Sequence, residues 1–67
     1  MEVTVNQQKY SVSETCSVEE LVLKVLNRPA KGIAIAINQT IVPKTNWMAQ
    51  QLQNGDQIVM ITATQGG

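Results

Sequence analysis

Only one segment of this 67-residue chain has the periodicity of an amphipathic helix. Ser17 and Glu20 have the spacing of a capping box, which satisfies free N–H groups at a helix start. Pro29 and Gly32 mark where the pattern ends. Between these signals, the apolar residues recur at intervals of three and four and form one stripe: Val18, Leu21, Val22, Val25 and Leu26. A single helix of about ten residues therefore has to bury one apolar face against something else.

The segments around this helix predict strands. Residues 2–5 and 9–12 alternate polar and apolar residues, and Asn6-Gln7-Gln8 between them predicts a hairpin. Residues 33–37 are apolar on both faces, which predicts a strand that is covered on each side or keeps one side for a partner. Residues 57–62 are also apolar on both faces.

Two further signals complete the order of elements. Asn38-Gln39 predicts a turn into a strand at residues 40–42, which Pro43 stops and thereby marks as an edge strand. Asn54-Gly55-Asp56 predicts the turn before the last strand. One helix on one face of a mixed four- to five-stranded sheet predicts an α+β protein with the β-grasp (ubiquitin-like) fold. The last strand is expected beside the first, in parallel, at the centre of the sheet.

The expected core is aliphatic, because the chain contains one Trp, one Tyr and no Phe. Trp47 is interpreted as a packing plug within a short helical turn at residues 44–53, which also carries Met48 and Leu52. The methionines are interpreted as core filler. Most of the core is predicted to be Val3, Val5, Leu21, Val22, Val25, Leu26, Ile35, Ile37, Ile58 and Met60.

Composition excludes several classes of function. Five basic and five acidic residues give no net charge, whereas a nucleic-acid-binding domain normally has a basic excess. One Cys and no His leave neither a disulfide nor a plausible zinc site, and they exclude catalysis by histidine. Apolar runs are too short for a membrane span, and no signal peptide is recognisable. We expect a cytoplasmic monomer that is not itself an enzyme and binds no cofactor or metal.

Gly66-Gly67 at the C-terminus points to a different kind of function. Glycine packs poorly and bends freely, so residues 63–67 are expected to form a flexible tail with an unhindered carboxylate. The alternative is a frayed terminus without a role. A partner enzyme could activate the Gly67 carboxylate with ATP, and a sulfur nucleophile or an amine could then attack it.

Two other candidates remain. Ala34, Ala36, Val59 and Ile61 would lie on the sheet face that one helix cannot cover, and they are predicted to form a small partner-binding patch. Cys16 lies beside a helix start, which can lower a thiol pKa, but it has no basic neighbour in sequence and is interpreted as structural.

Several motifs in order resemble the ThiS family of sulfur carriers across essentially the whole chain. The helix start at residues 17–22 matches, and residues 34–43 resemble the family stretch A-(L/V)-A-(I/V)-N-x-x-(I/V)-(V/I)-P. Trp47 stands at a common family Trp, Gly55-Asp56-Gln57-Ile58 matches a G-D-x-(I/V) motif, and the terminal diglycine completes the set. Gln65 departs from the small or apolar residue of many relatives, and we expect it to bear on the choice of partner.

The resemblance implies a role in forming the thiazole of thiamine. A ThiF-type enzyme would adenylate Gly67, a sulfur donor derived from a cysteine desulfurase would convert it to a thiocarboxylate, and thiazole synthase ThiG would receive the sulfur. Gly66 has no side chain and would therefore let the reacting end enter a narrow active site. Alternatives are a MoaD-like carrier for molybdopterin, a ubiquitin-like protein modifier, and an adaptor domain that needs no free tail.

Overall fold

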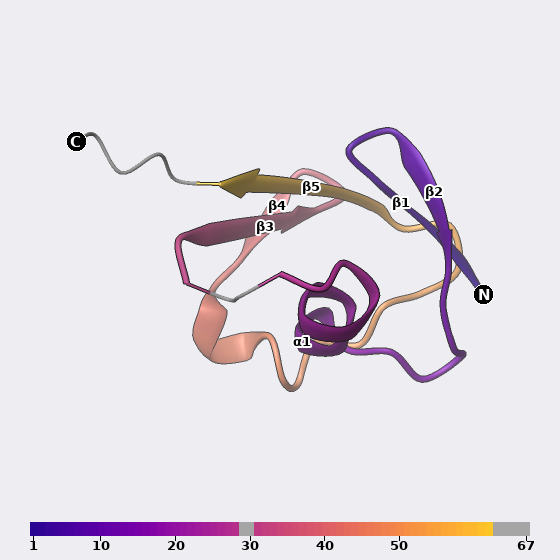
Figure 1. The fold of residues 1–67 in the computed structure, drawn as a ribbon, viewed down its shortest axis with the longest axis horizontal. Coiled ribbons are helices and arrows are strands. Elements are labelled where there is room, and N and C mark those ends of the chain that lie inside the picture. Colours follow the sequence, from indigo (N-terminus) through magenta and orange to yellow (C-terminus); the bar gives the residue numbers. More distant parts are fainter. Residues whose placement is uncertain (29–30, 63–67) are drawn as a thin grey trace.

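The computed structural model describes residues 1–28 and 31–62. The predicted tail over residues 63–67 lies outside these described residues. Within them, five strands form one mixed sheet in the order β2-β1-β5-β3-β4, and one helical segment covers a single face of it (Figure 1). The strands are β1 (Glu2–Val5), β2 (Gln8–Ser11), β3 (Ile33–Ile37), β4 (Thr40–Val42) and β5 (Gln57–Thr62).

The sequence prediction of an α+β β-grasp with the last strand at the centre is confirmed. β5 runs parallel to β1, with Val5 opposite Ile58, and antiparallel to β3, with Ala36 opposite Val59. β4 lies at the edge of the sheet, as Pro43 indicated. Four strands have the predicted bounds, whereas β2 is shifted by one residue because the first hairpin turn contains only Asn6 and Gln7.

Both hairpins are closed by the same dipeptide. Asn6 and Gln7 have φ values of 49° and 71°, and Asn38 and Gln39 have 49° and 73°. Two successive residues with positive φ are what a two-residue type I′ turn requires. Asn tolerates this left-handed conformation better than most residues other than Gly, so it suits the first position of each turn.

The helical segment begins as predicted but does not stay α-helical. Ser17 caps α1 (Val18–Glu20), since the Glu20 backbone N–H donates to Ser17 Oγ at 3.2 Å. The chain then widens into a π-helical turn, η1 (Leu21–Val25), in which the Leu26 N–H donates to the Leu21 carbonyl. Asn27 follows with φ 53° and ends the helix earlier than the spacing predicted, before Pro29.

The π turn changes which residues face the sheet. A π turn holds more residues than an α turn, so each residue after Leu21 is rotated back relative to the α-helical stripe. Leu21 and Val22 remain fully buried, but Val25 is 36% exposed and the prediction that it belongs to the core is wrong. Leu26 is only partly buried against the core.

The core otherwise follows the predicted apolar faces. Met60 is also only partly buried and packs against the core rather than inside it. The structure adds buried residues that the predicted core did not include. Among the described residues, the buried apolar side chains are Val3, Val5, Val12, Cys16, Val18, Leu21, Val22, Ile35, Ile37, Val42, Trp47, Leu52 and Ile58.

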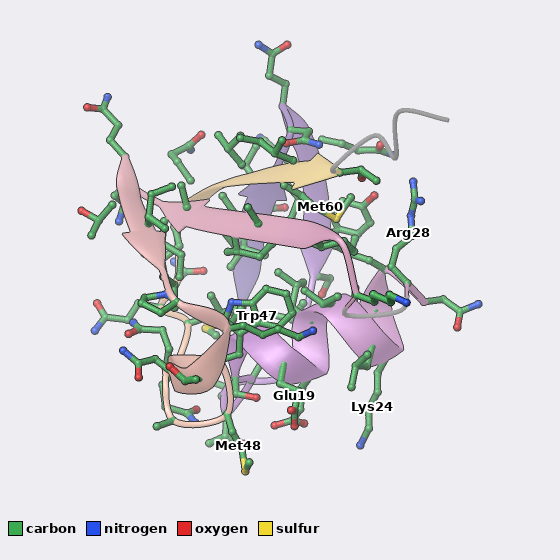
Figure 2. The ribbon with its side chains drawn as sticks, turned by 90° about the vertical axis from the view of Figure 1, so that its left-hand side faces the viewer. Glu19, Lys24, Arg28, Trp47, Met48 and Met60 are labelled. Carbon is green, nitrogen blue, oxygen red and sulfur yellow. The ribbon has the colours of Figure 1, made fainter. Side chains whose placement is uncertain are left out.

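Trp47 closes one end of this core, as the sequence indicated. It follows the short helix η2 (Lys44–Asn46), and its side chain lies between the helical segment and the sheet (Figure 2). Its Nε1–H donates to the Val42 carbonyl at 3.0 Å. Met48 points away from the fold and is 71% exposed, so its interpretation as core filler is wrong. No helix among residues 1–28 and 31–62 is long and apolar enough to cross a membrane.

Candidate functional site

The sheet face opposite the helix carries a strip of exposed apolar side chains. Strands alternate their side chains between two faces, so burying Ile35 and Ile58 against the helix turns their neighbours outward. Ala34 pairs with Ile61 and Ala36 pairs with Val59 across β3 and β5. The structure therefore brings together the four residues that the sequence predicted for this face.

The four side chains on this face are exposed to different degrees. Val59 is 48% exposed and Ile61 is 54% exposed, Ala34 is exposed and Ala36 is half-buried. Because the side chains of Ala34 and Ala36 are small, β3 projects less from this face than the larger side chains of the neighbouring strands. No helix lies on this face in the described part of the chain (Figure 1). The predicted exposure is thus confirmed, whereas partner binding by these residues stays a prediction.

Ile41 is a member of the strip that the sequence analysis missed. It lies opposite Ala36 on the edge strand β4 and is 62% exposed, more than any other residue of the strip. Val42 next to it packs inward, so strand alternation turns Ile41 outward, but a strand of three residues gives too little alternation to show this from sequence. From here on, the apolar strip means Ala34, Ala36, Ile41, Val59 and Ile61.

The same face is polar on its other half. Thr4 of β1 lies opposite Gln57 and Lys9, while Glu2 lies opposite Ser11. The open face is therefore divided between a polar half on β1, β2 and the first residue of β5 and an apolar half on β3, β4 and the rest of β5. An exposed apolar area with a polar border is typical of a protein-binding surface.

The apolar strip runs along the strand that leads to the C-terminus. β5 ends at Thr62, directly after Ile61. The predicted site residues Gln65, Gly66 and Gly67 lie outside the described residues, so their roles remain predictions. The structure shows the apolar strip on the strand that precedes these three residues.

Cys16 does not supply a reactive thiol. Its side chain is buried, with Sγ 3.5 Å from the Ser17 carbonyl. Burial raises the pKa of the thiol above its ordinary value, and the nearby Glu20 carboxylate raises it further. Both effects oppose ionisation, so the interpretation of Cys16 as a structural residue is supported.

Residues 1–28 and 31–62 contain no group of three or more His, Cys, Asp or Glu side chains that could hold a metal ion. Asp56 is engaged at the start of β5, where its carboxylate accepts from the Gln53 N–H at 2.8 Å and from the Asn38 amide at 3.2 Å. Its oxygens are thus occupied by structural hydrogen bonds.

Comparisons with known proteins agree with this geometry. The sequence model of the ThiS family matches residues 1–67. The "Sulfur carrier protein ThiS" of Escherichia coli (strain K12) is 37% identical over 67 residues, which is the full length of both chains.

Two solved structures share the fold. A crystal structure of a thiamine biosynthesis protein (ThiS) from Geobacter metallireducens has a TM-score of 0.84 at 23% identity over the whole of both chains. A solution structure from the same organism has a TM-score of 0.78 at 24% identity and covers this whole chain and 88% of the other. These structures agree in fold, and the full-length sequence matches place the chain in the ThiS family.

Proposed function

We propose that this protein is a sulfur carrier in thiamine biosynthesis and that the carboxylate of Gly67 carries the sulfur. The observation that carries the proposal is the full-length match to the ThiS family, whose Escherichia coli member is named a sulfur carrier protein. The apolar strip beside the C-terminal strand supports it, because a carrier needs a surface for the enzymes that act on its end.

The chemistry begins with activation of a poor acyl donor. A Gly67 carboxylate oxygen attacks the α-phosphorus of ATP on a ThiF-type partner, which forms the acyl-adenylate and releases pyrophosphate. A hydrosulfide-type nucleophile, with sulfur from a cysteine desulfurase route, then attacks the acyl carbon. A C–S bond forms, the C–O bond to AMP breaks, and the product is a thiocarboxylate and AMP.

In this proposal the chain is a protein co-substrate and not an enzyme. It binds no cofactor of its own, and ATP is consumed on the adenylating partner. Gly66 and Gly67 let the end enter a narrow active site, since a side chain there would restrict the backbone. Thiazole synthase ThiG then takes the sulfur. Docking of the adenylating partner would use the apolar strip, and Gln65 would contribute to partner choice.

The test is intact-mass spectrometry after incubation with a ThiF-type enzyme, ATP and a sulfide source. We expect the chain to gain about 16 Da, the mass difference between sulfur and oxygen, as the terminal oxygen is replaced. Deletion of Gly67 should abolish this gain, and Gly66→Ala should slow it. A full-length chain that never gains the mass, or a deletion variant that gains it equally well, would overturn the proposal.

The acceptor separates the thiamine role from its closest alternative. Thiocarboxylated chain is supplied in parallel to thiazole synthase and to a molybdopterin synthase large subunit, and loss of the added mass is followed over time. We expect turnover only with thiazole synthase. Turnover only with the molybdopterin enzyme would move the chain to the MoaD-like role.

A further inference from the structure

Within residues 1–28 and 31–62, the last half of β5 has a strand partner on one side only. β1 pairs with β5 at Thr4 and Val5, opposite Gln57 and Ile58, and then turns away at Asn6. On the other side, β3 stays paired with β5 as far as Thr62. The part of β5 that leads to the C-terminus therefore lacks a neighbouring strand where β1 has ended.

The backbone groups exposed by this mismatch can be identified. The Thr4 N–H donates to the Asp56 carbonyl at 3.0 Å, and the Asn6 N–H donates to the Ile58 carbonyl at 2.9 Å. Alternate residues of a central strand bond to opposite neighbours, so residues 56 and 58 face β1. Met60 is the next residue with this orientation, and no β1 residue stands opposite it.

The side chain of Asn6 fills that place. Its Oδ1 accepts a hydrogen bond from the Met60 N–H at 2.9 Å, and its Nδ2 donates to the Met60 carbonyl at 3.1 Å. A side-chain amide thus makes the pair of bonds that a further strand residue would make. The left-handed conformation of Asn6, at φ 49°, accompanies this arrangement.

We propose that Asn6 is a positioning residue for the reaction at Gly67, because its amide clamps Met60 and fixes the direction in which β5 leaves the sheet. This inference rests on the proposed carrier function. Met60 lies two residues before Thr62, the last residue of β5, so the clamp limits the directions in which the following segment can leave the sheet. Misplacement of reacting atoms by about 1 Å can already cost up to ~100-fold in rate.

Asn38 offers a matched control at the opposite end of the same strand. It occupies the same position in the second hairpin, with φ 49°, and its Oδ1 accepts from the Gln57 N–H at 3.0 Å. Its Nδ2 donates to Asp56 Oδ1 at 3.2 Å. Asn6→Gly and Asn38→Gly therefore each keep a turn that tolerates positive φ and each remove two side-chain hydrogen bonds to the β5 region.

The first measurement is the kinetics of adenylation of each chain by a ThiF-type enzyme at saturating ATP. We expect Asn6→Gly to lower kcat by about fivefold or more and to change KM by less than about twofold, because the apolar strip is intact. Asn38→Gly should stay within about twofold of the wild type in both constants. A general loss of stability would affect both variants alike, so equal losses of kcat would overturn the positioning role.

The second measurement does not depend on activity. Amide hydrogen exchange at Met60 should be faster in Asn6→Gly than in the wild type and unchanged in Asn38→Gly. Unchanged exchange at Met60 in Asn6→Gly would overturn the clamp. If circular dichroism shows that Asn6→Gly is unfolded, Asn6→Asp replaces it. That variant keeps the acceptor for the Met60 N–H and sets an oxygen against the Met60 carbonyl, and it should lower kcat as well.

The positioning role of Asn6 and the carrier function of the chain can be overturned separately. Normal adenylation of a folded Asn6 variant overturns the positioning role and leaves the carrier function intact. A wild-type chain that is never converted overturns the carrier function and the positioning role with it, while the exchange result at Met60 still decides whether the clamp exists.

Discussion

At the scale of single residues, Trp47 stabilises the fold in two ways. Its side chain is 2% exposed, and its indole N–H satisfies the Val42 carbonyl at 3.0 Å. We expect Trp47→Phe to lower the free energy of unfolding by about 1–3 kcal/mol, because a buried acceptor loses its donor and a space opens beside it. Urea denaturation measures this. Met48→Ala should change it by less than about 0.5 kcal/mol, and equal losses in both variants would contradict this role of Trp47.

Cys16 should be protected from reagents that attack thiolates. Its pKa is raised by burial and by Glu20, so the folded chain holds less thiolate at any given pH than the unfolded chain. We expect alkylation by iodoacetamide at pH 8 to be slow in buffer and fast in concentrated urea. Equal rates would show that the thiol is accessible in the folded state.

The same shift predicts the pH dependence of stability. A thiol pKa that is raised on folding lets the unfolded chain lose its proton first, so stability falls as pH rises above the unfolded value near 9.0. Below that pH the thiol is neutral in both states and its contribution is complete. In Cys16→Ala this part of the alkaline decline should be absent, and identical pH profiles for the two chains would contradict the assignment.

The residue scale also shows where sequence reasoning ended. The turn formed by Asn6 and Gln7 could be predicted from residue type, because Asn favours left-handed turns. The hydrogen bonds from the Asn6 amide to Met60 could not be predicted, because the two residues are 54 positions apart in the sequence. The contact forms because β5 continues past the point where its pairing with β1 ends. Local pattern predicted the lengths of β1 and β5, but it does not specify the register between them, which leaves Met60 without a β1 residue opposite it.

At the scale of elements, the helical segment is the clearest difference from expectation. Ser17 caps the helix as the sequence predicted, and the Glu20 carboxylate accepts from the Ser17 hydroxyl at 3.4 Å. The widening at Leu21–Val25 was not predicted. Helix periodicity assumes α geometry throughout, so it placed Val25 in the core. The π turn is decided by how the segment packs on the sheet, which the local sequence does not specify.

This geometry predicts unequal costs for truncation along the helix. Leu21→Ala should destabilise the protein by about 2–5 kcal/mol, because a fully buried side chain is removed. Val25→Ala should cost less than about 1 kcal/mol, since Val25 is 36% exposed. Chemical denaturation of both variants measures the difference. A larger loss of stability for Val25→Ala than for Leu21→Ala would contradict the π turn and support an α-helix with Val25 in the core.

At the scale of the whole molecule, the order of elements was predictable and so was the face left open. One helix can cover one face, and strands that are apolar on both sides then leave a strip exposed. Ile41 was missed because a three-residue strand gives little alternation to interpret. The division of the open face into polar and apolar halves required the strand order.

This division leads to a prediction about docking. Ile61→Asp should weaken binding to a ThiF-type enzyme by about tenfold or more, because covering one large aliphatic side chain contributes about 1.5–3 kcal/mol. Stability should change by less than about 0.5 kcal/mol at this exposed site. Isothermal calorimetry and circular dichroism measure the two effects. Gln57→Glu adds the same charge to the same strand outside the strip, and equal weakening by both variants would contradict docking on the strip.

The central position of β5 has a consequence for the synthesis of the protein. β5 is the last of the five strands to be translated, yet it joins β1 to β3 and so holds the two hairpins in one sheet. A nascent chain that has not yet released β5 has two hairpins without a common sheet, and isolated hairpins are marginally stable in water. The complete apolar strip, with Val59 and Ile61 in place, therefore forms only after β5 has been translated. In the proposed function, an activating enzyme that binds this strip would not bind unfinished chains.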